Sequence, residues 1–361
     1  MAKKKLAFDE VAYLLPSDIL FLILNRVPSV KSLLRFKSVS KSWNVMISDY
    51  AFRRSHRDQS KALGREMLLV HKLSNYEFEF RDLETSRLVV MAKEVFPLTK
   101  FRKALVLCSG DGFLLLKNPR AYKSYVLWNP STGEYKSLVC PYFNQNQEVP
   151  NGCGLCYDSS VDDYKVIFIY KSSYAIYSMN NCCWREKTIS LHAAVTLLQD
   201  CSLSGGISIN GCVYWPHYSH YVVRNAIIVY FDGKSHELKE LPVPYFVGDN
   251  DWFRVSSFKS CLSLYGGNGD SLVLDIWIME RHGWKLFLKI SKLRTICKTF
   301  IENKVLLCCT RNGEILFQGC GDCSRLFIYY PRTQLLREAN ISKVYSRNQD
   351  FPLISTCLES L

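Results

Sequence analysis

The sequence predicts a small α-helical module at the N-terminus, followed by an all-β domain built as a six-bladed propeller. Three patterns support this fold class. Apolar residues recur at helical spacing between positions 14 and 56, short apolar runs alternate with polar turns from about residue 64, and the turns recur at near-constant spacing. We therefore expect a helical domain at residues 10–56 and a propeller at residues 64–361.

The helical module divides into three short segments. The first has one apolar helix face, formed by Ile19, Leu20, Ile23, Leu24 and Val27. We expect Ser17 or Asp18 to cap its first turn, and Pro28 to end it, because the residue before a proline is pushed out of the helical region. Ser29 is then placed to cap a second helix. A third segment carries Val39, Trp43, Val45 and Ile47.

The module carries more apolar surface than three short helices can bury among themselves, which predicts a binding partner. Its charge indicates what kind of partner. Residues 1–65 hold 13 Lys and Arg against 5 Asp and Glu, so +8 of the net charge of +13 lies in the first fifth of the chain. This asymmetry favours an acidic protein, although a nucleic acid or a membrane would also fit the charge alone.

A repeat becomes visible when the polar turns of the second domain are aligned. Successive turns begin at Asp82, Asn129, Met179, Asp232, Glu280 and Pro331, which lie 47 to 53 residues apart. A period of about 50 residues with four strands in each unit is typical of a kelch-like propeller blade. Aromatic residues recur beside the same turns, where we expect them to pack between blades: Trp128, Trp184, Phe231, Trp277, Trp284 and Tyr330. The alternative is a pair of β-sandwiches.

A propeller must also close its ring, because an open ring leaves an unpaired edge strand. The β-rich segment at residues 352–361 is expected to complete the first blade beside Glu66–Lys72.

The cysteines and histidines do not form a pattern that predicts a metal site. The chain has 15 cysteines and no secretory signal pattern, so we expect reduced, mostly buried thiols. Two Cys-x-x-Cys pairs, Cys153/Cys156 and Cys320/Cys323, are far apart and flanked by strand-like residues, which argues against a zinc site. His217 and His220 have no evident third ligand. We expect no metal and no cofactor, and no catalytic motif is found.

The N-terminal module resembles a plant F-box. The resemblance rests on Leu15-Pro16, Asp18-Ile19-Leu20, Ile23-Leu24, the run from Val30 to Lys37, and the run from Val39 to Trp43. The chain departs from the common plant pattern in one place, where Ser29 stands between Pro28 and Val30, which bears on the local turn only.

The rest of the chain resembles plant F-box-associated domains nearly to its end. Leu127 to Gly133 is similar to their Trp-Asn-Pro-Ser-Thr hairpin, and Gly154 to Val166 is similar to their Gly-Phe-Gly-Tyr-Asp-Ser-Ser-Thr-Asp-Asp-Tyr-Lys-Val-Val segment. Asn210 to Trp215 and Ile276 to Trp284 resemble further family segments in the same order. Cys156 replaces a glycine of the family pattern, and Tyr214 replaces a histidine.

The resemblance implies a non-catalytic substrate receptor of an SCF-type cullin-RING ubiquitin ligase. It would bind a Skp-family adaptor, and through it a cullin and a RING subunit. The expected adaptor contacts are Leu15, Pro16, Ile19, Leu20, Ile23, Leu24, Leu33, Phe36, Val39 and Trp43. Two other functions stay open: a DNA-binding protein using Lys31, Arg35, Lys37 and Lys41, and a ligand-binding propeller unrelated to ubiquitination.

Substrate contacts are expected in two propeller loops at residues 216–224 and 248–254. Exposed aromatic and arginine side chains suit interface anchors, which selects Tyr218, His220, Tyr221, Trp252, Phe253 and Arg254. The alternative is that these aromatics belong to the core between blades. We expect a cytoplasmic or nuclear protein that neither spans a membrane nor binds nucleic acid.

Overall fold

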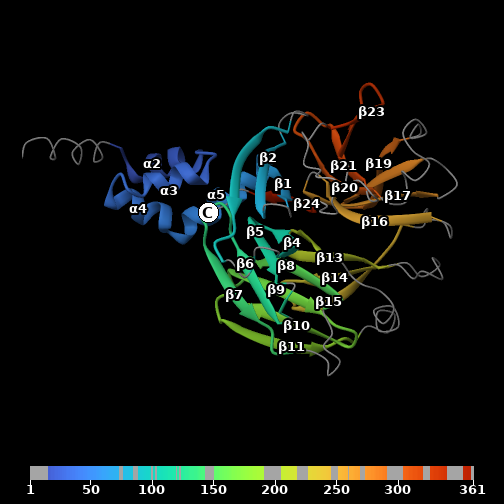
Figure 1. Ribbon diagram of the computed structural model, residues 1–361, viewed down its shortest axis with the longest axis horizontal. Coiled ribbons are helices and arrows are strands. Elements are labelled where there is room, and N and C mark those ends of the chain that lie inside the picture. The colour runs from blue at the N-terminus through green and yellow to red at the C-terminus, as the bar shows by residue number, and fades with distance from the viewer. Residues whose placement is uncertain are drawn as a thin grey trace, which may run out of the picture.

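The computed structural model describes residues 15–72, 76–83, 88–98, 101, 104–118, 120, 121, 123–142, 150–190, 205–217, 227–244, 251–258, 260–268, 273–290, 304–319, 326–339 and 353–358. A group of helices projects from one side of a ring of β-sheets (Figure 1). Among the described residues, no helix combines the length and the apolar character that a membrane span requires.

The described helices are α2 (Ser17–Asn25), α3 (Val30–Phe36), α4 (Lys41–Ser48) and α5 (Tyr50–Ala62). Side-chain caps set three of the starts. The hydroxyl of Ser29 accepts from the backbone N–H of Ser32, Ser40 caps α4 in the same way, and a carboxylate oxygen of Asp49 accepts from the first turn of α5. The predicted cap at Ser29 is confirmed. The predicted cap at Ser17 or Asp18 is wrong, because α2 begins directly after Pro16 without a side-chain cap.

The helices share a small apolar core formed by Leu20, Leu24, Leu33, Ile47 and Phe52. Phe21 packs edge-on against Phe52, with ring centroids 5.2 Å apart. The fourth helix, α5, lies partly beyond the predicted end of the module at residue 56. It buries Phe52, His56, Arg57 and Ser60, a set with little apolar character, so apolar spacing did not reveal it.

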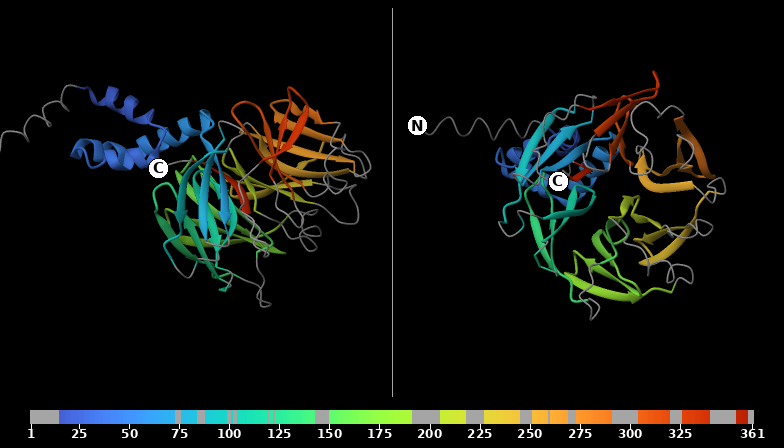
Figure 2. Two further views of the ribbon diagram at one scale, coloured as in Figure 1. Left: turned by 45° about the horizontal axis from the view of Figure 1, so that its top comes forward. Right: turned by 45° about the vertical axis from the view of Figure 1, so that its right-hand side comes forward.

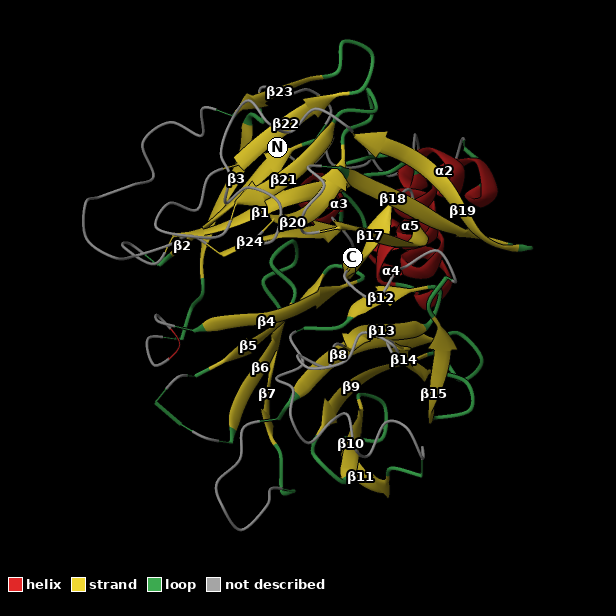
Figure 3. Ribbon diagram, turned by 90° about the vertical axis from the view of Figure 1, so that its right-hand side faces the viewer, coloured by secondary structure: helices red, strands yellow, loops and turns green. Residues whose placement is uncertain are grey.

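The ring consists of six four-stranded antiparallel sheets in the described residues, which confirms the six-bladed propeller. Figure 2 shows the ring from a second side, and Figure 3 shows its strands against the helices. Blade 1 contains β24 (Leu353–Leu358), β1 (Glu66–Lys72), β2 (Glu77–Asp82) and β3 (Val90–Val95). Blade 2 contains β4 (Leu105–Gly110), β5 (Phe113–Lys117), β6 (Ser124–Trp128) and β7 (Tyr135–Val139), and blade 3 contains β8 (Gly152–Asp158), β9 (Asp163–Ile169), β10 (Ser173–Ser178) and β11 (Cys183–Thr188).

The other three blades complete the circle. Blade 4 contains β12 (Ile207–Ile209), β13 (Cys212–His217), β14 (Ile227–Asp232) and β15 (Glu237–Pro242). Blade 5 contains β16 (Asp251–Phe258), β17 (Cys261–Asn268), β18 (Leu274–Glu280) and β19 (Gly283–Ile290), and blade 6 contains β20 (Lys304–Cys309), β21 (Ile315–Gly319), β22 (Leu326–Tyr330) and β23 (Leu335–Glu338). Each of the six predicted turns joins the third and fourth strands of one blade.

The ring closes through the C-terminal strand, as predicted. β24 pairs antiparallel with β1, from Glu66 opposite Leu358 to His71 opposite Leu353. The first blade therefore takes its innermost strand from the end of the chain and its other three strands from the segment that follows the helices. This pairing satisfies an edge of β1 that would otherwise be open.

Apolar clusters fill all six junctions between neighbouring blades. Trp128 packs with Phe78 of blade 1, Phe231 with Tyr174 of blade 3, and Trp277 with Ile228 of blade 4. The predicted aromatics at the turns are confirmed as interblade residues, with Trp184, Trp284 and Tyr330 half-buried in their clusters. Complete burial of a large apolar side chain contributes roughly 1.5–3 kcal/mol, so these junctions dominate the stability of the ring.

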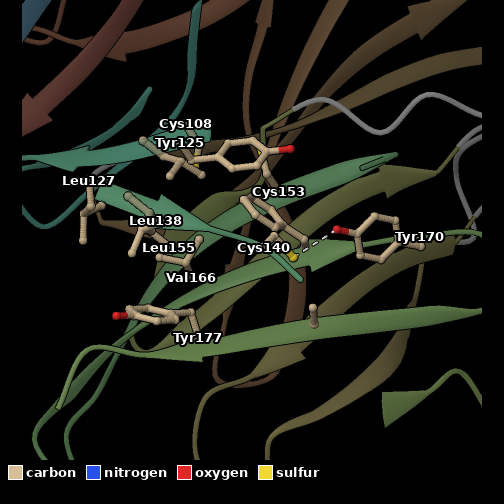
Figure 4. Close-up of a cluster of buried hydrophobic side chains, with 13 residues drawn as sticks. Cys108, Tyr125, Leu127, Leu138, Cys140, Cys153, Leu155, Val166, Tyr170 and Tyr177 are labelled. Atoms are coloured by element: carbon tan, nitrogen blue, oxygen red, sulfur yellow. Dashed lines mark hydrogen bonds between the residues drawn. The ribbon is translucent and has the colours of Figure 1, made fainter. Parts of the chain in front are cut away.

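Figure 4 shows the cluster between blades 2 and 3, which explains one Cys-x-x-Cys pair. Cys153 belongs to this cluster, whereas Cys156 points to the other face of β8 and belongs to the cluster between blades 3 and 4. Two thiols on opposite faces of one strand do not converge on a common ion. Cys320 and Cys323 lie outside the described residues, and so does His220, while nothing is described of the side chain of His217.

Candidate functional site

Helix α2 presents a second apolar face to the outside. Leu20 and Leu24 point into the helical core, but Ile19, Leu22 and Ile23 on the other side of the helix, and Leu15 just before it, are each 44–52% exposed. A surface helix of a globular protein normally has polar residues on its outer face. This outer face of α2 is therefore an exposed hydrophobic patch of the kind that marks a protein interface.

The structure separates the predicted adaptor contacts into two groups. Leu15, Pro16, Ile19, Ile23 and Val39 are exposed. Phe36 and Trp43 are half-buried and pack edge to face, with ring centroids 5.6 Å apart. In contrast, Leu20, Leu24 and Leu33 are enclosed by the helical unit itself, so we remove them from the expected contact surface.

Two exposed residues that sequence reasoning missed extend the same surface. Leu22 lies on the outer face of α2, and Val45 of α4 is 71% exposed. Val45 also borders a groove between α2 and α4, which is lined by Phe21, Lys41, Ser42, Val45, Met46 and Asp49. The apolar side chains Phe21, Val45 and Met46 of this groove suit an apolar segment of a partner protein.

The basic residues of the helical unit are not all equivalent. Lys31 forms an ion pair with Glu94 of β3, with nitrogen and oxygen 2.5 Å apart, so it is engaged with the propeller. Burial, together with the positive charge of Arg53, lowers the pKa of Lys37. Arg35 and Lys41 are exposed. Of the four cations considered for DNA binding, Arg35 and Lys41 are therefore exposed and have no partner among the described residues, whereas Lys31 is paired with the propeller.

Helix α5 contacts the propeller along one stripe. Tyr50, Arg57 and Lys61 follow one another at intervals of seven and four residues, which places them on the same side of a helix. The hydroxyl of Tyr50 lies 2.6 Å from that of Tyr157, and the ammonium group of Lys61 lies 2.5 Å from a carboxylate oxygen of Asp111. The three residues therefore attach the helix to blades 2 and 3.

Arg57 forms the middle contact of this stripe and is only 5% exposed. Its guanidinium donates to the hydroxyl of Tyr164 at 3.0 Å and lies 3.8 Å from the centre of the Tyr157 ring. Burial would lower the pKa of Arg57, but the interactions with Tyr164 and Tyr157 more than offset this effect and raise it. A desolvated cation over an aromatic ring contributes about 2 kcal/mol, so this contact is the strongest of the stripe.

The predicted substrate contacts are only partly described. Tyr218, His220 and Tyr221 lie outside the described residues, and of Trp252 only the backbone is described, as part of β16. Residues 251–254 form strand rather than loop. Phe253 is buried in the cluster between blades 4 and 5, so its prediction as an exposed anchor is wrong and the interblade alternative is correct for it. Arg254 is half-buried.

The strand order places the end of β13 and the start of β16, which border the two candidate loops, at one rim of the ring and the helices at the other. Helix α5 contacts Asp111 between β4 and β5, and Tyr157 and Tyr164 at the turn between β8 and β9, where first strands lead into second strands. The end of β13 and the start of β16 lie at the opposite rim, because second strands end where first strands begin. The rim reached by β13 and β16 is therefore remote from the helices.

Comparison with known proteins matches both parts of the chain to protein families. A model of the F-box-like family matches residues 12–58, and a model of the F-box associated beta propeller domain matches residues 67–361. An F-box/kelch-repeat protein of Arabidopsis thaliana is 28% identical over 366 residues, covering 94% of this chain and 96% of the relative. A putative F-box protein of the same plant is 24% identical, covering 88% of this chain and 89% of the relative, and a further F-box protein is 24% identical, covering 83% of each.

Proposed function

The chain belongs to the F-box proteins that carry an F-box associated beta propeller domain, and from this premise we propose that it is the substrate receptor of an SCF-type ubiquitin ligase. The helical unit binds a Skp-family adaptor, which connects it to a cullin and a RING subunit. The propeller binds a protein substrate. Proteins of this family are typically adaptors rather than catalysts, so we assign no chemical step to this chain.

The exposed outer face of α2 carries this proposal. Leu15, Ile19, Leu22 and Ile23 are exposed, so none of the described part of the chain covers them. The groove between α2 and α4 continues this apolar surface with Val45 and Met46. The positive charge of the N-terminal segment favours an acidic adaptor.

The contribution of this protein to ubiquitin transfer is proximity. Binding of substrate and adaptor on one chain converts the encounter between a substrate lysine and the ubiquitin-charged enzyme into an intramolecular event, which raises the effective concentration. We propose that the substrate binds at the rim reached by β13 and β16. That rim is favoured because it is remote from the helices and leaves the adaptor surface accessible.

Co-purification with a Skp-family adaptor tests the proposal. The variant Ile19→Asp with Ile23→Asp places two carboxylates in the proposed interface, where an unpaired charge is costly to bury, so adaptor affinity should fall by roughly 100-fold or more. Both side chains are exposed in the free chain, so the thermal unfolding transition should not move. Leu335→Asp, at a similarly exposed leucine of β23, is the matched control and should bind as the native chain does.

Two results would overturn the proposal. The native chain could fail to capture the adaptor, or the double variant could bind it with native affinity. Leu20→Asp with Leu24→Asp cannot replace this test, because both leucines lie in the helical core and their substitution would unfold the module.

A further inference from the structure

Helix α5 is shared between the helical unit and the propeller. On one side, Phe52 is buried in the helical core, and the Nε2 of His56 donates to the backbone carbonyl of Val27 at 3.0 Å. On the other side, Tyr50, Arg57 and Lys61 contact blades 2 and 3. One rigid element therefore takes part in both domains.

The connection from α5 to the propeller is short and closed by hydrogen bonds. Only Leu63, Gly64 and Arg65 separate the helix from β1. The N–H of Gly64 donates to the carbonyl of Lys61, and the N–H of Arg65 donates to the carbonyl of Ser60 at 2.9 Å, which is the Schellman arrangement of a helix end. Gly64 supplies the positive φ of 60° that this arrangement requires.

Apart from Asp111 and Phe113 of blade 2, the propeller side of this joint is built from one segment of blade 3. The hydroxyl of Tyr157 contacts that of Tyr50 and donates to a carboxylate oxygen of Asp162 at 2.7 Å. Tyr164 accepts from Arg57, and its ring lies 5.0 Å from that of Tyr157 and 4.9 Å from that of Phe113. Tyr157, Asp162 and Tyr164 belong to the segment from Gly154 to Val166, which resembles the family pattern.

We propose that Tyr157, Asp162 and Tyr164 form a socket for Arg57 that fixes the direction of the propeller relative to the adaptor-bound helices. Arg57 is then a positioning residue for ubiquitin transfer, and this role rests on the proposed function. Its guanidinium lies over the Tyr157 ring and donates to Tyr164 and to Asp58 at the same time, which the ammonium group of a lysine cannot reproduce. A fixed direction limits which lysines reach the charged enzyme.

The structural part of the test measures how firmly α5 holds the propeller, and it needs no ligase. Spin labels on unnatural amino acids at Asn44 of α4 and Leu335 of β23, both exposed, report the distance between helices and ring by pulsed electron resonance in the full chain. We expect a single narrow distance distribution for the native chain and a broad one for Arg57→Ala. Arg57→Lys should also broaden it. Arg54→Ala, which removes an exposed arginine of the same helix, is the matched control and should leave it narrow.

The functional arm uses the chain's own lysines as the ubiquitin acceptors. In a ligase reconstituted with adaptor, cullin and RING subunit, mass spectrometry should find a restricted set of modified lysines for the native chain and Arg54→Ala, and a wider set for Arg57→Ala and Arg57→Lys. Adaptor affinity should not change, because Arg57 lies on the propeller side of α5. If Arg57→Ala does not fold, Arg57→Lys decides.

A narrow distance distribution in both Arg57 variants would overturn the proposed socket. A broad distance distribution together with an unchanged set of modified lysines would overturn the positioning role of Arg57. If the native chain captures no adaptor, the proposed function has failed, but the distance measurement still decides whether Arg57 fixes the joint.

Discussion

The hydroxyl of Tyr164 accepts a hydrogen bond of 3.0 Å from the guanidinium of Arg57, and this contact joins a helix to a propeller blade. Tyr164→Phe removes this acceptor, so the buried guanidinium keeps only its hydrogen bonds to Asp58 of its own helix. Loss of a buried hydrogen bond to a charged group costs roughly 1.5–3 kcal/mol. Hydrogen exchange of the α5 amides should show a smaller opening free energy by that amount, because the helix loses its strongest contact with the ring.

Lys61→Ala serves as the comparison for Tyr164→Phe. Lys61 is 40% exposed in its ion pair with Asp111, and an ion pair open to solvent contributes no more than about 1 kcal/mol. Its effect on the α5 amides should therefore be the smaller of the two. Equal effects, or a larger effect of Lys61→Ala, would contradict the assignment of Arg57 and Tyr164 as the centre of the joint.

Deletion of residues 353–361 should destabilise the whole ring. The deletion removes β24 and leaves β1 with an unpaired edge, and it also removes Leu358, which is buried. We expect a lower unfolding temperature, a broader transition and a tendency to aggregate, measured by calorimetry and size-exclusion chromatography. Deletion of residues 359–361 alone keeps every pair between β24 and β1 and should unfold as the native chain does. An unchanged transition for the longer deletion would show that the closing strand is dispensable.

The stability of the protein should fall in mild acid because of His71. Its imidazole is fully buried, stacks on Phe78 with centroids 4.1 Å apart, and has no hydrogen-bond partner among the described residues. Burial lowers its pKa from 6.5 to about 4, so the folded state holds the neutral form. The contribution of neutral His71 to the free energy of unfolding is fully present above pH 6.5. It is lost as the pH falls towards 4, and the total loss is about 3 kcal/mol.

His71→Phe keeps the stacked ring and removes the titration. Denaturant unfolding between pH 7 and pH 4.5 should therefore show a weaker pH dependence for this variant than for the native chain. His56 is a second buried histidine whose pKa is lowered by burial, so part of the acid effect should remain in His71→Phe. An identical pH profile for variant and native chain would exclude His71 as a cause.

Cys182 should react faster with alkylating agents than its exposed neighbour Cys183. Both thiols are accessible at the turn between β10 and β11. The ammonium group of Lys136 lies 2.9 Å from the sulfur of Cys182, and this hydrogen bond lowers the pKa of the thiol, so more thiolate is present at neutral pH. Mass spectrometry after a timed iodoacetamide reaction measures both rates. Lys136→Met should remove the advantage of Cys182, and a persistent advantage would count against the role of the lysine.

The repeat was predictable because the turns contain residue types that favour turns by themselves. In blade 2, a side-chain oxygen of Asn129 accepts from the N–H of Ser131 and Thr132, and Gly133 adopts a φ of 79°. Such residues mark a turn even without knowledge of the strands around it. The spacing of six turns then gave the number of blades, and the need for a closed ring gave the pairing of the last strand.

The contact surface of α2 could only be predicted in part. The helix is apolar on two sides, so apolar spacing locates it but does not tell which side faces the core. Leu20 and Leu24 face inward, whereas Ile19, Leu22 and Ile23 face outward, and only the positions of α4 and α5 decide this. Helix α5 was missed for a related reason, because it buries His56, Arg57 and Ser60 rather than an apolar stripe.

The pairing of β24 with β1 has a consequence for synthesis on the ribosome. The helices and blades 2 to 6 can be translated before the first blade is complete, because β24 is encoded after all the other strands of the ring. A nascent chain thus carries an accessible β1 edge until β24 has been synthesised. A premature stop codon between residues 66 and 353 would yield a polypeptide with an intact F-box region and a ring that cannot close, and such an allele should behave as one whose product is cleared by quality control.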